Sequence, residues 1–344
     1  MALEATWYAT QLRQELCARN RRYAAGRAHV ESYGSQPVIV YAPAGGRHGN
    51  FFDAAYAAIA AHPEWMRRFG KMHAQAARSL PKAERRWREL DSSMSSDALL
   101  MNIFCTPGAA DSAAVQNMLG VEAGAAPIFG WKARVPLANG RFDRTEVDMR
   151  LGSLLVEAKL TENDFQTREA AVVETYRDFD EVFDRELLPR VEMQTRRRKA
   201  PTEFPEDYSQ EFESFVDTEA AVWSHQPGSH FAMTPGPATD SIGGAAEPGY
   251  ASYQLIRNVL AAYAAQCSFC VVHDERRPDL REEWFRIMAA VKSATMRTRL
   301  KVLTWQELAA VLPGDLQNFL DVKYGIVAPG RTASPVDGVP DFGA

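Results

Sequence analysis

The sequence is poor in cysteine and contains no long apolar run. Its four cysteines, Cys17, Cys105, Cys267 and Cys270, are too few and too scattered for a disulfide framework. No apolar run approaches the ~20 residues that a membrane-spanning helix needs, and the N-terminus lacks the basic-then-apolar pattern of a secretory signal. These absences argue against secreted and membrane proteins, and they predict a cytoplasmic protein with no membrane partner.

The sequence also lacks an excess of positive charge. Lysine and arginine number 39 against 44 aspartate and glutamate residues, which gives a formal net charge of -5. Proteins dedicated to nucleic-acid binding are usually basic, so this balance argues mildly against a tight, non-specific binder. A local basic groove can still lie on an acidic body, so the composition does not exclude nucleic acid as a partner.

What the sequence does contain is enough apolar material for a sizeable core, since 46% of the 344 residues are hydrophobic. The order of the predicted elements favours an α/β fold. Strands are expected in 127–137 and in two runs within 145–162, and a helix over 253–264 precedes a buried strand over 268–273. A further strand is expected at 300–303. Antiparallel strands followed by helical crossovers indicate a mixed central sheet flanked by helices.

The predicted helices also give a domain plan. Helices over 5–28, 51–77 and 82–90 predict a mainly helical N-terminal extension, and a charged helix is expected over 168–188. We therefore expect an extension over residues 1–90 and a core over residues 91–326. The core contains an irregular insertion at about 196–249, and residues 327–344 form a flexible tail.

Two polar features lie outside the predicted sheet. The glycine-rich stretch APAGGRHGN at 42–50 invites comparison with a phosphate-binding loop, but the Gly-Lys-Ser/Thr ending is missing, so a plain turn is the better interpretation. Asn102 is the polar member of the apolar helix expected over 98–105. It is either a hydrogen-bonded core amide or a side chain aimed at a site, and we favour the core amide because most isolated buried polar groups are structural.

The stretch TEVDMRLGSLLVEAKLTE at 145–162 concentrates charged side chains in an apolar setting. Two extended runs meet at Leu151-Gly152-Ser153, which predicts a hairpin. Residues two apart on a strand share a face, so Glu146 lies on the same face as Asp148, and Glu157 lies on the same face as Lys159. Three carboxylates and an amine can then converge at one end of a sheet. Acid groups embedded in an apolar strand cost free energy unless they are paired or bind a metal.

These residue types fit phosphodiester hydrolysis. Magnesium binds through one or two carboxylates together with water and phosphate, so Asp148 and Glu157 are candidate ligands for Mg²⁺ or Mn²⁺. Lys159 can polarise the attacking water or stabilise the charge that develops on the phosphate. The structural alternative is a hairpin with a cross-strand pair between a lysine and a carboxylate. That alternative explains Lys159 and one acid, but not all three acids.

An acid followed by Glu157-Ala158-Lys159 on the next strand resembles the PD-(D/E)XK nuclease superfamily, whose fold is restriction-endonuclease-like. The likeness covers about residues 91–326, from SSDALLMNIFC through TEVDMRLGSLLVEAKLTENDF to YQLIRN, and is closest to a bacterial subgroup. It implies magnesium-dependent DNA cleavage, with Asp148 and Glu157 as metal ligands and Lys159 as the catalytic amine. Gln254 resembles the glutamine that RecB-like members place near the site.

The sequence therefore predicts a metal-dependent DNA nuclease. Glu146 and Gln254 are expected to support the catalytic group, and a basic cluster is expected to meet the phosphates of the substrate: Arg196, Arg197, Arg198 and Lys199. The acidic net charge fits an enzyme that needs a partner subunit, or a site gated by the irregular segment from Arg196 to Gly249. A homodimer or a partner subunit is therefore expected. Two alternatives stay open: a nucleic-acid-binding or interaction module with a degenerate nuclease fold, and a small-molecule metallohydrolase with a deep pocket. The choice between DNA and RNA, and between endo and exo action, also stays open.

Overall fold

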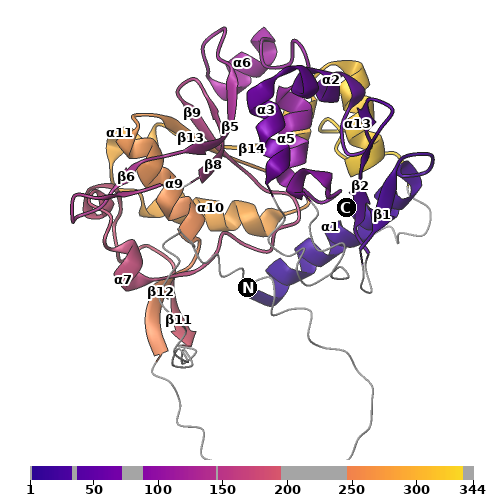
Figure 1. Ribbon diagram of the computed structural model, residues 1–344. Helices are drawn as coiled ribbons and strands as arrows, with labels where there is room; N and C mark the ends of the chain where they lie inside the picture. Colours follow the sequence, from indigo (N-terminus) through magenta and orange to yellow (C-terminus); the bar gives the residue numbers. More distant parts are fainter. Residues whose placement is uncertain (1, 33–36, 72–87, 145, 195–245, 336–344) are drawn as a thin grey trace, which may run out of the picture.

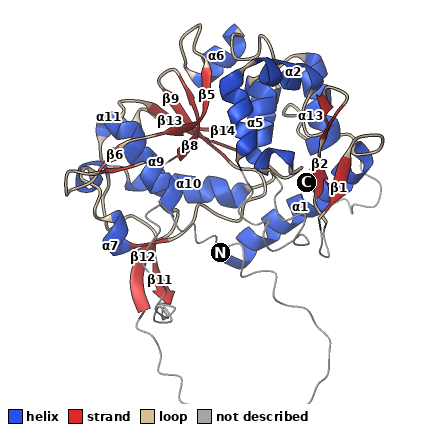
Figure 2. Cartoon of the chain, viewed as in Figure 1, coloured by secondary structure: helices blue, strands red, loops and turns tan. Residues whose placement is uncertain are grey.

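The computed structural model describes residues 2–32, 37–71, 88–144, 146–194 and 246–335. Strands at the centre of the main body are enclosed by helices (Figure 2). The central sheet has the order β14-β13-β9-β8-β5. Its strands are β5 (Pro127–Lys132), β8 (Glu146–Leu151), β9 (Leu154–Ala158), β13 (Ser268–His273) and β14 (Leu300–Thr304).

The sheet is mixed, as the order of elements predicts. Strands β5, β8 and β9 pair antiparallel, whereas β9, β13 and β14 run parallel. The two parallel connections pass through α9 (Tyr253–Ala264) and α10 (Pro278–Ala290). Strand β9 therefore joins the antiparallel half of the sheet to the parallel half. Its carboxyl end lies beside the carboxyl end of β13 and the amino end of β8.

Helices cover both faces of this sheet (Figure 1). Helices α9 and α10 bury Leu255, Val259 and Trp284 against one face. The other face is covered by α5 (Ser96–Phe104), α6 (Ala113–Leu119), α12 (Trp305–Ala309) and α13 (Gly314–Tyr324). The predicted α/β architecture, a mixed sheet flanked by helices, is confirmed.

The N-terminal segment packs on the second of these faces. Helix α1 (Ala2–Tyr23) lies along α13, and α2 (Asp53–Ala61) packs on α5. Short elements complete the segment: β1 (His29–Glu31), β2 (Ile39–Tyr41), β3 (Pro43–Ala44), β4 (Arg47–His48), α3 (Pro63–Arg67) and the 3-10 turns Arg68–Gly70 and Glu89–Asp91. Within the described ranges, no helix is both long and apolar enough to cross a bilayer.

Local sequence signals explain several boundaries. The Ser95 hydroxyl accepts from the backbone N–H of Ala98 and caps α5, and Thr304 forms a capping box with Glu307 at the start of α12. Gly152 adopts φ 58° in the β8–β9 hairpin, a conformation that glycine reaches without steric cost. A turn at Asn139-Gly140 joins β6 (Val135–Pro136) to β7 (Phe142–Asp143).

Two predicted elements are wrong. Residues 168–188 form no single helix, but β10 (Arg168–Glu169), α7 (Ala170–Val173) and α8 (Phe179–Val182). The charged residues of this segment are spaced as on a helix face, but they pair across turns: Arg185 contacts both Glu174 and Asp180. Residues 127–137 are not one strand either, because β5 ends at Lys132 and the chain then leaves the central sheet for the β6–β7 pair.

The irregular insertion predicted at about 196–249 falls mostly on residues 195–245, which lie outside the described residues. Residues 246–249 belong instead to strand β12 (Ala246–Tyr250), which pairs with β11 (Arg190–Gln194) in a ribbon that projects from the body (Figure 1). The helix expected over 82–90 is described only at 88–90, where Glu89 and Leu90 begin a 3-10 turn. One further short helix, α11 (Ala294–Arg297), lies between α10 and β14.

Asn102 is a hydrogen-bonded core amide, as the favoured interpretation holds. Its Oδ1 accepts from the backbone N–H of Phe52 at 2.6 Å, and its Nδ2 donates to the carbonyls of Asn50 and Ala98 at 3.0 and 2.8 Å. The side chain has no exposed surface. Asn102 therefore ties the N-terminal segment to α5.

We expect Asn102→Ala to lower the free energy of unfolding by about 2 kcal/mol or more, because it removes the acceptor of the Phe52 N–H and the side-chain donor to the carbonyls of Asn50 and Ala98 in the core. Urea denaturation measures the change. Asn117→Ala, at an exposed position of α6, is the matched control. Equal stability of the two variants would contradict the role given to Asn102.

Candidate active site at the diverging ends of strands β8 and β9

The pairing of β8 with β9 stops short of their charged ends. The last backbone pair is Met149 with Val156, and the next position would set Asp148 opposite Glu157. Beyond this pair, the hydrogen bond between the strands is made by a side chain and not by the backbone. Oδ2 of Asp148 accepts from the Ala158 N–H at 2.7 Å. The two strands therefore separate at the point where the acidic residues occur.

The charged side chains of β9 face helix α9. One oxygen of Glu157 lies 3.2 Å from Nζ of Lys159, and its other oxygen accepts from Nδ2 of Asn258 at 2.7 Å. Nζ of Lys159 also donates to Oε1 of Gln254 at 2.8 Å. Gln254 and Asn258 are four residues apart on α9, so both amides reach the same side of the helix. The ion pair is thus fixed at both ends.

Asp148 lacks such compensation. Burial raises the pKa of its carboxyl well above the usual range, and the negative charges of Glu157 and Asp97 raise it further. The ammonium of Lys159 and the N–H of Ala158 oppose this rise but do not overcome it. Asp148 is half-buried, whereas Glu157 and Lys159 are 4% and 5% exposed. Negative charge is therefore in excess around Asp148.

Lys159 shows the opposite balance. Burial alone would lower the pKa of its amine, but the carboxylates of Glu157 and Glu162, followed by that of Asp148, outweigh burial and raise the pKa. The amine is accordingly a fixed cation at neutral pH. It serves as a hydrogen-bond donor, and an uncharged base is not available at this position.

Glu146 belongs to a neighbouring cluster. Its Oε1 accepts from Nη1 of Arg68 at 2.6 Å, and its two oxygens lie 3.4 and 3.1 Å from the amines of Lys71 and Lys132. Burial opposes ionisation of Glu146, yet these cations lower its pKa to about 2. Nη2 of Arg68 also contacts Oδ2 of Asp97 at 2.8 Å. Arg68 thereby connects Glu146 to an acid that influences Asp148.

Gly130 makes room for this cluster. The pairing of β5 with β8 skips the position where Gly130 stands opposite Asp148, and Gly130 adopts φ 61°. A Cβ at this position would lie 2.2 Å from Nη1 of Arg68. Backbone pairing is therefore interrupted on both sides of Asp148, and a guanidinium occupies the space that a side chain at position 130 would fill.

The structure thus brings together Asp148, Glu157, Lys159 and Gln254, four of the residues singled out from the sequence. It places Glu146 beside them in the Arg68 cluster, two positions along β8. The predicted substrate-binding cluster, residues 196–199, lies outside the described residues.

Sequence reasoning missed four contributors: Arg68, Asp97, Gly130 and Asn258. Asp97 directly precedes the helix expected over 98–105, and Arg68 lies in the segment predicted as an addition to the core. Gly130 sits inside a predicted strand, where an isolated glycine signals a close approach of other atoms. Gly130 was therefore the one feature of the sequence that pointed to a close contact at this position.

The donor set decides which metal ion the site could hold. Within the described residues, no three His, Cys, Asp or Glu side chains converge as a metal cage. Asp148 and Glu157 alone supply two carboxylates with charge in excess. Such a pair fits a hard cation like Mg²⁺, which completes its coordination with water and substrate oxygens, and does not fit a closed structural site.

Comparison with known families identifies the family of the chain. Residues 18–325 match the family described as Restriction Endonuclease associating with ARP. The chain belongs to this restriction endonuclease family. The family match supports a nuclease-type function, and it begins within α1, so it includes Arg68 as well as the sheet. No curated protein and no solved structure matches the chain significantly.

The charge excess at Asp148 predicts that Asp148→Asn stabilises the protein in the presence of a chelator. The raised pKa means that Asp148 ionises less readily in the folded state, so its charge removes stability as the pH rises from about 4 through the folded-state pKa. Asparagine keeps an acceptor for the Ala158 N–H. We expect a gain on the order of 1 kcal/mol at pH 8 and a smaller gain at pH 5, measured by urea denaturation. A variant less stable than the wild type at pH 8 would contradict this.

Glu146→Gln should behave in the opposite way. The lowered pKa of Glu146 means that its charge adds stability above about pH 4.5, and this contribution is lost as the pH falls toward 2. We expect a loss on the order of 1–2 kcal/mol at pH 7 that shrinks in acid. Glu169→Gln, at an exposed position of β10, is the control and should change little at either pH. A Glu146→Gln loss that does not depend on pH would exclude the charge as its cause.

Proposed function

We propose that the protein is a metal-dependent nuclease that hydrolyses phosphodiester bonds of DNA. The observation that carries this proposal is the pairing of two close carboxylates, Asp148 and Glu157, with a fixed cation, Lys159, where two strands separate. Like charges held together at a half-buried position are costly unless a cation joins them. Membership of a restriction endonuclease family supports the same reaction class.

Asp148 and Glu157 are the residues that would hold Mg²⁺ or Mn²⁺. When bound, the metal supplies Lewis-acid stabilisation of the phosphate and lowers the pKa of a coordinated water. The chain's own part is to keep the two carboxylates in place. Ala158 orients one of them through its backbone N–H, and Asn258 orients the other through its amide.

Lys159 would act on the substrate as a charged donor. An ammonium has three N–H groups, and two of them are directed at Glu157 and Gln254. The third is then available for a phosphate oxygen or for the attacking water. Because the amine is fixed on both sides before substrate arrives, its charge needs no reorganisation during the reaction. Gln254 is accordingly a positioning residue for Lys159.

Other parts of the proposal concern binding. Arg196, Arg197, Arg198 and Lys199 would contact DNA phosphates, which makes the affinity sensitive to salt. Glu146 would act through Arg68 and Asp97 on the charge around Asp148. We further propose that the protein acts in the cytoplasm, as a homodimer or with a partner subunit that supplies affinity for DNA.

A degenerate nuclease that only binds nucleic acid is the second candidate. It is favoured by one observation: both oxygens of Glu157 already have partners inside the protein. The small-molecule metallohydrolase is less well supported. Two cavities bordered by described residues, of about 610 and 420 Å³, are lined by neither Asp148 nor Lys159.

We expect the purified chain to cleave DNA with Mg²⁺ or Mn²⁺ and to lose activity with a chelator. Asp148→Asn, Glu157→Gln and Lys159→Ala should each lower the cleavage rate about 100-fold or more. Gel assays on plasmid and linear DNA measure the rate. Calorimetric titration with Mn²⁺ should show weaker binding in the two carboxylate variants and near-normal binding in Lys159→Ala.

Glu282→Gln, at an exposed position of α10, is the control for removal of a carboxylate. Undiminished cleavage in all three site variants would refute the assignment of the site. Salt-sensitive DNA binding without cleavage in either metal would instead support the degenerate module.

A further inference from the structure

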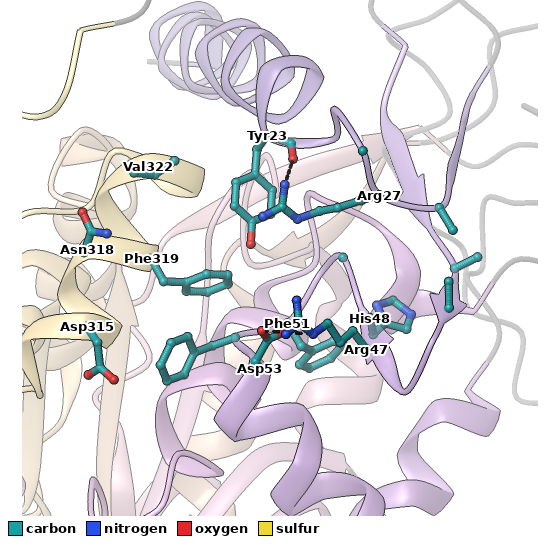
Figure 3. Close-up of a pocket in the computed structure, with 16 residues that line it drawn as sticks. Tyr23, Arg27, Arg47, His48, Phe51, Asp53, Asp315, Asn318, Phe319 and Val322 are labelled. Carbon is teal, nitrogen blue, oxygen red and sulfur yellow. Dashed lines mark hydrogen bonds and ion pairs between the residues drawn. The ribbon is translucent and has the colours of Figure 1, made fainter.

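A second candidate binding site lies in the N-terminal segment. The glycine-rich stretch at 42–50 forms the tight β3–β4 hairpin, in which Gly45 and Gly46 adopt φ 57° and 76°. This hairpin, the end of α1, the start of α2 and one side of α13 enclose a cavity of about 610 Å³ (Figure 3). Protein pockets for small ligands commonly have volumes of this size.

Two arginines line the cavity. The Arg27 guanidinium lies 3.8 Å from the centre of the Tyr23 ring and donates to the Tyr23 carbonyl at 2.5 Å (Figure 3). Among the described residues, no carboxylate pairs with Arg27. Nε of Arg47 lies 3.5 Å from Asp53 in an exposed pair, and such pairs contribute little. The cavity therefore presents one unneutralised guanidinium and one loosely paired guanidinium.

Aromatic rings form the opposite side. The Phe319 ring from α13 stands edge-on to Tyr23 with their centres 6.0 Å apart, and it lies 5.7 Å from the ring of Phe52. Asp315 and Asn318 from the same helix complete this side (Figure 3). The cavity thus combines a group of aromatic surfaces, an amide that can both donate and accept, two guanidinium groups, and the carboxylates of Asp53 and Asp315.

The walls are held in place before any ligand arrives. Asn102 fixes the backbone of Asn50 and Phe52 through its hydrogen bonds. Gly49 packs so closely on Tyr41 that an added Cβ would lie 2.3 Å from the tyrosine ring. A preformed site loses less free energy on binding than one that must first become ordered.

We propose that this cavity binds a nucleotide. The base would stack on the rings of Phe319 and Phe52, and the phosphate would bind the guanidinium groups of Arg27 and Arg47. Guanidinium groups match phosphate oxygens in charge and geometry, and aromatic side chains stack on bases of any sequence. Asn318 is placed to hydrogen-bond the edge of the base or the sugar.

The nucleotide has two possible sources with the same chemistry: a free nucleotide, or the unpaired end of a DNA strand. The proposal does not rest on the proposed nuclease function, since neither Asp148 nor Lys159 lines the cavity. Loss of DNA cleavage and loss of nucleotide binding can therefore be observed separately.

The test is calorimetric titration of the full chain, in a chelating buffer, with ATP, with dAMP and with a duplex that carries an unpaired, 5′-phosphorylated end. Binding of the mononucleotides identifies a free nucleotide as the ligand, and binding of the duplex alone identifies a strand end. In either case, Arg27→Ala and Arg47→Ala should each weaken binding about tenfold or more. Arg27→Lys should weaken it less than Arg27→Ala.

Arg141→Ala, an exposed arginine in the turn between β6 and β7, is the matched control and should bind as the wild type does. Thermal unfolding checks that each variant is folded, and Arg47→Ala keeps the test open if Arg27→Ala does not fold. Three results would overturn the proposal: no binding of any probe at millimolar concentration, equal binding by the two arginine variants and the control, or equal affinity for pyrophosphate and ATP.

Discussion

The cost of taking charge out of water governs the architecture of this protein. Glu157 and Lys159 leave water together at the end of β9, and a buried ion pair is costly unless further hydrogen bonds compensate for the lost hydration. Helix α9 supplies two such bonds through Gln254 and Asn258. The mixed topology brings α9 to that strand end, because the crossover from β9 to the parallel strand β13 must pass over it.

Asp148 is the part of the site that the fold does not neutralise. Its neighbours leave it with raised pKa and partial exposure, while the adjacent Glu146 is fully compensated by Arg68 and Lys71. Their surroundings therefore shift the pKa values of these two acids on one strand in opposite directions. Perturbed carboxylates of this kind gather where proteins bind metals or perform chemistry. The N-terminal segment contributes to this difference in pKa, because it supplies both Arg68 and Lys71.

Much of the fold could be predicted because its signals are local. The helix over 253–264 and the strand over 268–273 follow from apolar periodicity, and the structure has both at the predicted bounds. Residues 168–188 misled the periodicity argument, because charges paired across turns can imitate a helix face. The contact of Arg68 with Glu146 spans 78 residues, and no spacing rule reaches across such a distance. The grouping of Asp148 with Glu157 and Lys159 could thus be predicted from the sequence, and the charges that surround the group could not.

The space beside Gly130 limits which residues position 130 can carry. A Cβ there would lie 2.2 Å from Nη1 of Arg68 as that side chain stands, so any residue larger than glycine requires the guanidinium to move. Such a movement would disturb the cation that Glu146 and Asp97 share. In this way a missing Cβ on the edge strand β5 helps to keep one guanidinium between two acids.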